Sequence, residues 1–203
     1  ATSVIYIAHV SLCTQFINMF GTEAQKHQFI PPLVKGDKIG AFALSEPGSG
    51  SDSAAMHTTA TKSDGHYSLN GTKLFITNAM EAETFVVMAS HDRSLRARGV
   101  DSFIVESGSS GFNINPQVGK MGIRGSSTAE LIFDNCLVPE QNRLGGEGEG
   151  FRETMQVLNA SRIGISAQCV GIAQAAYEAA ISYAKQREAF GQQLADFQSI
   201  QWT

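Results

Sequence analysis

Residues 41–52 hold the side chains best suited to bind a polar or anionic ligand. The segment begins with an apolar run, AFAL, that is typical of a strand, and continues as a loop, SEPGSGSD. Glycines expose backbone N–H groups because they lack a Cβ atom, and serine hydroxyls can donate or accept hydrogen bonds. The loop contains both types, at Gly48, Gly50, Ser45, Ser49 and Ser51. This pattern predicts a loop that binds a cofactor, and an ordinary surface turn is the alternative.

Two familiar phosphate-binding loops do not match this segment. A Walker-type loop needs a lysine after its last glycine, whereas Gly50 is followed by Ser51 and Asp52. In a dinucleotide-binding fold the glycine loop opens a helix. Here the next segment, TTATK, is rich in threonine and leads to a turn signal at Asp64 and Gly65. This is the composition of a strand and a turn, so the context excludes a Rossmann loop.

Composition argues against several classes of function. The chain has 203 residues, of which 42% are hydrophobic, and a net charge of -4. It has no dense run of lysine or arginine, so we expect no nucleic-acid binding. It shows no apolar run of about 18 residues, so we expect no membrane span. Neither a CxxC pair nor an HExxH motif is present, so no metal site is expected, and Cys13, Cys136 and Cys169 are expected to be buried thiols in a reducing compartment.

The first part of the chain has a helical pattern. Apolar residues at helical spacing predict a helix over residues 3–20 that ends at Gly21. A second helix is expected to begin at the cap residue Thr22. It is expected to end at Pro31 and Pro32, because proline lacks the N–H group that continues a helix.

The middle of the chain has a β pattern. Asn70 and Gly71 give its strongest hairpin signal. Short apolar runs between turns predict strands at residues 67–69, 73–77, 85–89, 102–105, 112–114 and 131–133. The predicted fold class is α+β, with a β barrel or sandwich between helical ends. We expect domain boundaries at residues 1–38, 39–149 and 150–203.

A long helix is expected over residues 151–187, after a glycine-rich hinge or linker at residues 145–150. Its Arg162 and Arg187 could bind anions. The alternative is that each arginine is solvated on the surface of the helix. They are 25 residues apart (187 minus 162), which corresponds to about 37 Å along an unbroken helix. One small ligand could not contact both. Neither end of the chain has a cap pattern, so we expect a longer protein.

Four motifs in register resemble the acyl-CoA dehydrogenase family, closest to its short-chain, butyryl-CoA type. They are FALSEPGSGSD at residues 42–52, LNGTKLFITN at 69–78, MGIRGSST at 121–128 and REAFG at 187–191. The resemblance implies an FAD protein with a helical N-terminal domain, a middle β domain and a C-terminal helical bundle, usually a homotetramer built as a dimer of dimers. It also implies α,β-dehydrogenation of short-chain acyl-CoA thioesters, with electrons passing to an electron-transferring flavoprotein.

The resemblance also implies ligand contacts, by position in these motifs. Ser45 would lie near the flavin ring, Thr77 would donate toward flavin N5, and Ser51 would bind the pantetheine of the acyl-CoA. Phe75 stands where many relatives have tryptophan, and Asn159 where they have aspartate. The implied cofactor contacts are Phe42, Ala43, Leu44, Ser45, Gly50, Ser51, Phe75, Ile76, Thr77, Arg187 and Gln198. The implied CoA contacts are Ser51, Asn159, Ala160, Ser161 and Arg162.

No catalytic base is expected in this chain. In most of the family the base is a glutamate of a Tyr-Glu-Gly motif far into the C-terminal domain, and in one branch it directly precedes the arginine matching Arg162. Ser161 occupies that position and cannot act as a carboxylate base. Glu46 and Asp52 are expected to cap turns. The 203 residues alone are therefore expected not to oxidise acyl-CoA.

Two other functions agree with the same motifs. An acyl-CoA oxidase or nitroalkane oxidase relative would pass electrons to oxygen, and a truncated homologue could bind flavin and CoA without catalysis. The expected location is the cytoplasm in a prokaryote or the mitochondrial matrix in a eukaryote.

Overall fold

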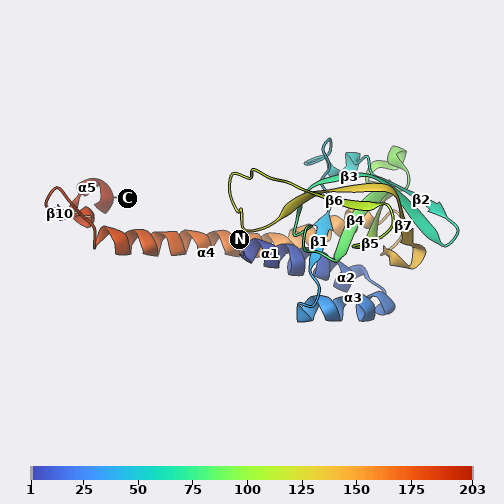
Figure 1. Cartoon of the computed structure of the whole chain (residues 1–203), viewed down its shortest axis with the longest axis horizontal. Helices are drawn as coiled ribbons and strands as arrows, with labels where there is room; N and C mark the ends of the chain where they lie inside the picture. Colours follow the sequence, from blue (N-terminus) through green and yellow to red (C-terminus); the bar gives the residue numbers. More distant parts are fainter. Residues whose placement is uncertain (1, 203) are drawn as a thin grey trace. The chain divides into compact units, whose positions relative to one another are not determined.

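The computed structural model describes residues 2–202. The chain forms two compact units, Ala1–Ser161 and Arg162–Thr203. The first unit contains the N-terminal helices, the sheet and the beginning of a long helix (Figure 1).

The first helical segment agrees with the predicted range of residues 3–20. It consists of α1 (Thr2–Ile7), a π-helical stretch (Ala8–Thr14) and α2 (Gln15–Phe20), and Gly21 follows as its C-cap. Within the π-helical stretch the Thr14 hydroxyl donates to the His9 carbonyl at 2.8 Å.

The same segment, Thr2–Phe20, is long and apolar enough to pass a composition test for a membrane span, with a mean hydropathy of 1.3. The expectation that the chain has no such run is therefore wrong. Cys13, Phe16 and Ile17 are fully buried in a core cluster that also contains residues of the sheet. Because 33% of the window is buried in this way, packing accounts for part of the apolar composition.

Helix α3 (Glu23–Lys35) begins as predicted, with a capping box between Thr22 and Gln25. The predicted end at Pro31 and Pro32 is wrong, because both prolines lie inside the helix. Two missing N–H groups weaken the helix locally. Burial of Phe29 and Leu33 on the face that packs into the core offsets this loss. The helix ends at Gly36, whose φ of 79° places it in the left-handed region.

The middle of the chain forms one eight-stranded sheet. Its strand order is β6-β7-β3-β2-β4-β5-β8, and β1 pairs in parallel with β4. The strands are β1 (Gly40–Ala43), β2 (Thr59–Ser63), β3 (His66–Thr77), β4 (Thr84–Ser90), β5 (Val100–Glu106), β6 (Phe112–Pro116), β7 (Thr128–Pro139) and β8 (Arg143–Leu144). Short 3₁₀ turns lie at Ser53–Ala55, Arg93–Gly99 and Glu140–Asn142. The predicted strand segments all fall within these strands.

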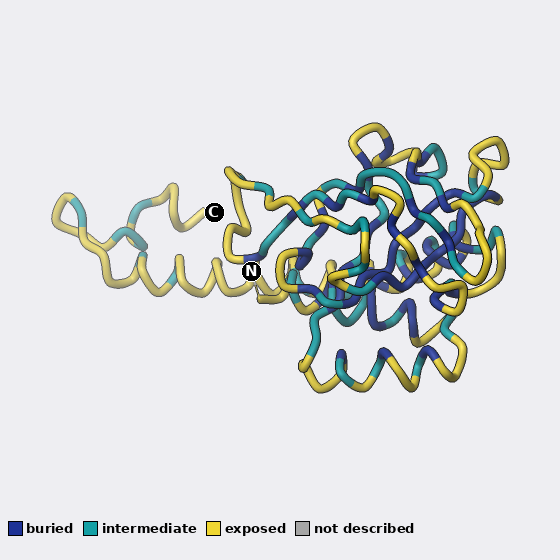
Figure 2. The backbone as a smooth tube through the Cα atoms, turned by 45° about the vertical axis from the view of Figure 1, so that its right-hand side comes forward, coloured by how far each residue is buried: buried dark blue, intermediate teal, exposed yellow. Residues whose placement is uncertain are grey.

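Every residue of β4 is buried, so both of its faces are covered. Figure 2 shows that buried residues gather in the interior around the sheet. Phe85 and Val87 belong to one apolar cluster of the sheet. Val86 and Met88 belong to a second cluster, which contains Phe16 and other residues of the N-terminal helices. Alternation along one strand therefore joins the sheet to the helices that precede it.

Asn70 and Gly71 do not form the predicted hairpin, because both lie inside β3 at a β-bulge. The hairpin between β2 and β3 turns instead at Asp64 and Gly65. Gly71 has a φ of 147°, and a Cβ atom there would lie 2.6 Å from the Thr58 hydroxyl oxygen. Glycine is therefore needed at this position for close approach to another segment.

The glycine-rich residues 145–150 connect β8 to α4, as expected of a linker, and they form a packed turn rather than a free hinge. The Gly148 N–H donates to Asp101 Oδ1 at 2.7 Å, and the Gly145 N–H donates to the Phe20 carbonyl at 3.2 Å. A Cβ atom on Gly150 would lie 2.6 Å from the Asp101 carbonyl carbon. These glycines allow the turn to lie against β5 and α2.

Helix α4 (Gly150–Ala184) is continuous, and its residues from Arg162 onward belong to the second unit. A short hairpin follows, with β9 (Glu188–Ala189) and β10 (Gln192–Gln193) joined by Phe190 and Gly191. A 3₁₀ turn (Leu194–Asp196) and α5 (Gln198–Gln201) complete the described chain. Cys13 and Cys136 are buried as expected, but Cys169 on α4 is exposed.

Candidate functional site

The loop after β1 is an ordered turn. The Glu46 N–H donates to the Ser49 carbonyl at 2.9 Å, and the Ser49 N–H donates to the Glu46 carbonyl at 3.2 Å. The Ser49 hydroxyl donates to the Asp52 carbonyl at 2.7 Å. A Cβ atom on Gly48 or Gly50 would meet no atom within 4 Å. Packing within the chain therefore does not require glycine at these two positions. Both glycines leave space at the backbone for a ligand.

A buried ion pair fixes both ends of this loop. Lys73 Nζ donates to Glu46 Oε1 at 2.8 Å and to the Leu44 carbonyl at 3.1 Å. The Glu46 carboxylate also accepts from the backbone N–H groups of His57, at 2.5 Å, and Thr58, at 3.0 Å. The side chain of Lys73 is 0% exposed and that of Glu46 is 2% exposed. The pair therefore connects the loop to β3 without contact with solvent.

Both members of this pair are charged near neutral pH. Burial by itself would raise the pKa of Glu46, but Lys73 and the hydrogen bonds more than offset it, so the pKa is lower than usual. Burial lowers the pKa of Lys73 to about 8, although Glu46 opposes this shift. Glu46 is thus a structural carboxylate rather than a proton acceptor. Asp52 is not a free base either, because it pairs with Arg96 at 2.8 Å.

Phe75 occupies an unusual position beside the loop. It lies at the bulge of β3 between Lys73 and Ile76, with a φ of 62°, and its side chain is 65% exposed. The neighbouring Leu74 N–H donates to the Ser45 carbonyl at 2.8 Å. A bulky residue in the left-handed region carries strain of about 1–3 kcal/mol, and such strain is concentrated at binding sites. The strand therefore presents an uncovered aromatic ring one residue after its hydrogen bond to Ser45.

Strand pairing and hydrogen bonds to other segments also fix the end of β3. Thr77 is paired with Thr128 of β7. Asn78, with a φ of 67°, is buried, and its Nδ2 donates to the Ile5 carbonyl at 2.9 Å and to the Gly40 carbonyl at 3.3 Å. These bonds attach the strand end to α1 and β1, so residues 75–77 have a rigid support.

The structure brings together most of the predicted cofactor contacts. Phe42, Ala43 and Leu44 lead into the loop, and the bonds from Lys73 and Leu74 hold this segment beside residues 75–77. Gly50 and Ser51 are exposed on the same loop. The role of each residue toward a ligand stays a prediction.

The predicted CoA contacts on α4 have a different setting. Asn159 and Ala160 lie at the end of the first unit with Ser161. The Ser161 side chain is buried, and its hydroxyl donates to the Leu158 carbonyl at 2.9 Å. Arg162, Arg187 and Gln198 belong to the second unit. Because α4 is unbroken to Ala184, the helix supports the expected wide separation of the two arginines.

Glu153 is a buried carboxyl near the start of α4. Its side chain packs against Gly145, and Oε2 has no hydrogen-bond partner among the described residues. Burial raises the pKa of Glu153 to about 7, with a smaller opposing effect from a backbone hydrogen bond from Gly146. The folded protein therefore holds a proton here that the unfolded chain releases near its ordinary pKa of 4.5.

We expect the folded protein to lose stability as the pH rises from about 5 to about 8. The folded-state pKa of Glu153 is raised, so its stabilising contribution is complete below the unfolded pKa and is lost as the pH passes through about 7. Urea unfolding should show a loss on the order of 2 kcal/mol over this range that Glu153→Gln abolishes. Glu147→Gln, at an exposed position of the preceding turn, is the matched control. An identical pH dependence in wild type and Glu153→Gln would contradict the assignment.

Most of the chain matches models of known protein domains. Models of three domains match it: the acyl-CoA dehydrogenase N-terminal domain at residues 1–37, the middle domain at 41–136 and the C-terminal domain at 148–203. The chain belongs to the acyl-CoA dehydrogenase family. The family predicted from the four motifs and the α+β fold predicted from the residue patterns are thus confirmed.

Curated members of the acyl-CoA dehydrogenase family are similar over the whole chain. The short-chain specific acyl-CoA dehydrogenase of Clostridium acetobutylicum is 48% identical over 99% of the chain. The mitochondrial short-chain specific acyl-CoA dehydrogenase of Rattus norvegicus is 48% identical over 100% of it. The chain covers 53% and 49% of these two proteins, so it spans about half the length of the curated relatives it matches.

Solved structures of acyl-CoA dehydrogenases show the same fold. Butyryl-CoA dehydrogenase from Megasphaera elsdenii has a TM-score of 0.94 and 48% identity, covering 98% of this chain and 52% of that one. A Bacillus anthracis acyl-CoA dehydrogenase complexed with FAD has a TM-score of 0.92 and 41% identity, covering 98% and 34%. A structure described as the electron transferring flavoprotein of Acidaminococcus fermentans has a TM-score of 0.95 and 47% identity, covering 98% and 52%.

Proposed function

We propose that this chain is part of an FAD-dependent acyl-CoA dehydrogenase that acts on short-chain acyl-CoA thioesters. The observation that carries the proposal is the strained, exposed Phe75, held beside the serine-glycine loop by the Leu74 to Ser45 hydrogen bond. The sequence identity of 48% to short-chain specific relatives supports the substrate class.

The residues of this site fit a flavin. An exposed aromatic ring can stack on a flat heterocycle, and the hydroxyls of Ser45 and Thr77 can donate to its polar atoms. Gly48 and Gly50 leave open space at the backbone. When bound, FAD would supply the hydride acceptor for α,β-dehydrogenation.

The described residues would position the reactants. The Glu46 and Lys73 pair fixes Leu44 and the end of the loop, so the donors of the loop need little reorganisation during the reaction. Ser51 is exposed on the same loop, where it could bind the pantetheine of the acyl-CoA. Glu46 and Asp52 are both engaged in ion pairs, which supports the proposal that a glutamate outside this loop removes the α-proton.

The proposal extends to the assembly and the partner. We propose a homotetramer in which Arg187 and Gln198 contact the FAD of a neighbouring subunit while residues 159–162 contact CoA. The continuous helix supports this arrangement, because one small ligand could not contact both Arg162 and Arg187. The reduced enzyme would pass electrons to an electron-transferring flavoprotein, in the cytoplasm of a prokaryote or in a mitochondrial matrix.

A substrate panel with the full-length protein tests this function. We expect butyryl-CoA to bleach the flavin absorbance under anaerobic conditions, and long-chain acyl-CoA thioesters to bleach it more slowly. Failure of every acyl-CoA to bleach the flavin would refute the proposal. Rapid reoxidation of the bleached flavin by air would indicate an oxidase instead.

A further inference from the structure

His9, in the π-helical stretch of residues 8–14, connects two other segments through both of its ring nitrogens. Its Nδ1 accepts from the Gly40 N–H at 2.9 Å, and its Nε2 bonds to the Leu33 carbonyl at 3.0 Å. A backbone N–H can only donate and a carbonyl can only accept, so these partners require a neutral imidazole with its proton on Nε2. His9 in this form joins the N-terminal helix to the end of α3 and to the first residue of β1.

Gly40 is the residue on which both halves of the candidate flavin site converge. It begins β1, which leads into the serine-glycine loop. Its carbonyl accepts from Asn78 Nδ2 at 3.3 Å, and Asn78 directly follows residues 75–77. A Cβ atom on Gly40 would lie 2.6 Å from Cys13 Sγ, so this backbone is pressed against the helix that carries His9. A displacement of Gly40 would therefore affect the loop and the end of β3 together.

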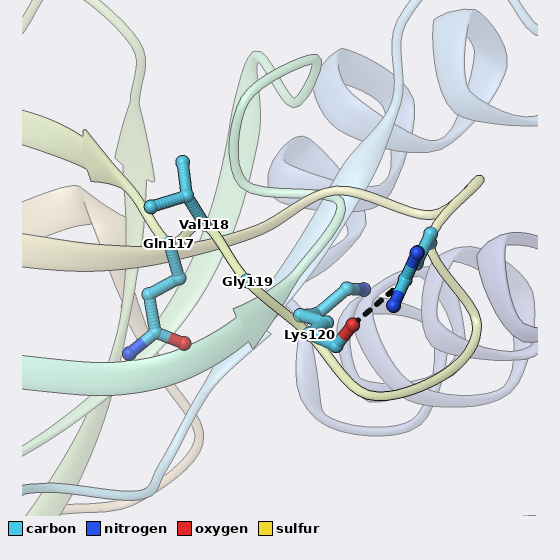
Figure 3. Close-up of a pocket in the computed structure, with 5 residues that line it drawn as sticks. Gln117, Val118, Gly119 and Lys120 are labelled. Carbon is cyan, nitrogen blue, oxygen red and sulfur yellow. Dashed lines mark hydrogen bonds between the residues drawn. The ribbon is translucent and has the colours of Figure 1, made fainter.

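The end of β3 lines a cavity that His9 does not touch. Phe75 and Thr128 border a space of ≈ 310 Å³ together with residues 117–120 of the loop between β6 and β7, which Figure 3 labels. Thr77 of β3 is paired with Thr128, so a shift of this strand end changes the shape of the cavity. His9 is not part of the lining, and its effect on a bound flavin must act through Gly40 and Asn78.

A separate cavity of ≈ 390 Å³ gives protons access to the His9 ring. Its lining consists of Tyr6, His9, Val10, Thr14, Leu33, Val34, Lys35 and Gly36. Among the described residues that form this lining, Lys35 is the single cation and no aspartate or glutamate is present. An imidazolium at His9 would therefore face a like charge in this cavity and no compensating carboxylate.

Two further titratable groups lie on the β1 side of His9. Burial raises the pKa of the Cys13 thiol to about 12, so it stays neutral. The Glu83 carboxylate accepts from the Ile39 N–H at 3.0 Å and is therefore already engaged. Protonation of His9 Nδ1 would place two donors face to face and remove the acceptor of the Gly40 N–H. Neither group can replace that acceptor in the present arrangement.

We propose that neutral His9 is a positioning residue for the flavin site, and that its protonation releases Gly40 and weakens flavin binding. This inference rests on the proposed function and adds an acid-sensitive control of the same site. In the neutral form, the bond to Gly40 fixes the start of β1 against the N-terminal helix. In the protonated form that bond is lost, and the loop and the end of β3 are less well ordered for the ligand.

The pH dependence of FAD binding by the full-length apoprotein tests the role of His9. Wild type should lose about tenfold in affinity between about pH 8 and about pH 5.5, the range in which histidines titrate. His9→Leu lacks both ring nitrogens and should bind FAD about tenfold more weakly than wild type at pH 8, with little further change at pH 5.5. His9→Asn offers Oδ1 as an acceptor for the Gly40 N–H and does not titrate, so its affinity should change by less than about twofold.

Hydrogen exchange of the apoprotein reports on the same bond without a flavin. We expect the protection factor of residues 40–43, corrected for the intrinsic effect of pH, to fall in wild type at pH 5.5 and in His9→Leu at both pH values. In His9→Asn it should stay close to that of wild type at pH 8. His27→Asn is the matched control, because His27 is an exposed histidine of α3, and it should keep the wild-type pH response.

Two results would overturn the role of His9. One is a pH response of FAD binding in His9→Asn equal to that of wild type, which decides the question even if His9→Leu does not fold. The other is a loss of protection at residues 40–43 without a loss of FAD affinity, which would show a purely structural role. Failure of the wild-type apoprotein to bind FAD at pH 8 would instead refute the proposed function, and the protection factors would still show whether His9 holds β1.

Discussion

Replacing Lys73 with methionine is expected to lower the free energy of unfolding by about 3 kcal/mol or more. The substitution leaves the Glu46 carboxylate buried without its cation, and loss of one partner from a buried ion pair costs about 3–5 kcal/mol. Glu46 would keep its bonds from the His57 and Thr58 N–H groups, which places the expected loss at the lower end of that range. Urea unfolding of wild type and variant measures this difference.

Two further variants separate charge burial from packing. Lys62→Met removes a lysine from an exposed ion pair with Glu140, where both side chains are about half exposed, and should cost less than about 1 kcal/mol. Glu46→Gln in the Lys73→Met background removes the uncompensated charge and should recover part of the loss. If Lys73→Met is no more destabilising than Lys62→Met, the buried pair does not stabilise the loop.

Local sequence signals predicted the elements whose ends depend on local bonds. Thr22 caps α3 because its side chain and that of Gln25 satisfy N–H groups within the same turn. Gly21 ends α2 in an extended conformation, and its N–H donates to the Ile17 carbonyl of the last turn at 2.8 Å. The order of helices, strands and helix follows from periodicity, which changes between residues 35 and 40 and again near residue 150.

Tertiary packing decided the elements that the sequence mispredicted. Pro31 and Pro32 are strong helix-ending signals, but α3 continues because Phe29 and Leu33 are one turn apart on the face buried in the core. Asn70 and Gly71 are a strong hairpin signal, but the strand continues because Gly71 is pressed against Thr58 and Asn70 Oδ1 accepts from the Asn135 N–H at 2.8 Å. In both cases the deciding contact is far away in the sequence.

Only part of the candidate site can be predicted from the sequence, because some of its contacts join residues that are distant in the chain. The serine-glycine loop is a local pattern, and it predicts a ligand-binding segment. The pairing of Glu46 with Lys73 joins residues 27 positions apart and leaves no local signature. Lys73 is in phase with the buried Tyr67 and Leu69 of β3, so a lysine at an inward position was the available signal for a buried partner.

Phe75 gives the prediction that most directly links strain to binding. Replacing it with glycine should weaken FAD binding by the full-length apoprotein about 30-fold, because stacking on an aromatic side chain contributes about 1–3 kcal/mol. Phe75→Ala should lose a similar affinity, whereas Phe75→Trp, which keeps an aromatic ring, should bind FAD within about threefold of wild type. Flavin fluorescence titration measures all three affinities.

Phe75→Gly and Phe75→Ala should differ in stability, although their affinities for FAD are similar. Glycine adopts a φ of 62° without strain, whereas alanine retains a Cβ that makes this conformation unfavourable by about 1–2 kcal/mol. Unfolding of the apoproteins in urea should therefore show Phe75→Gly about 1 kcal/mol more stable than Phe75→Ala, although both bind FAD weakly. Equal stabilities would mean that the bulge of β3 relaxes to an unstrained conformation when the ring is removed. In that case the backbone at residue 75 is not held in the left-handed region by the rest of the fold. If Phe75→Gly is the more stable variant and still binds FAD poorly, the fold carries this strain in order to present the ring.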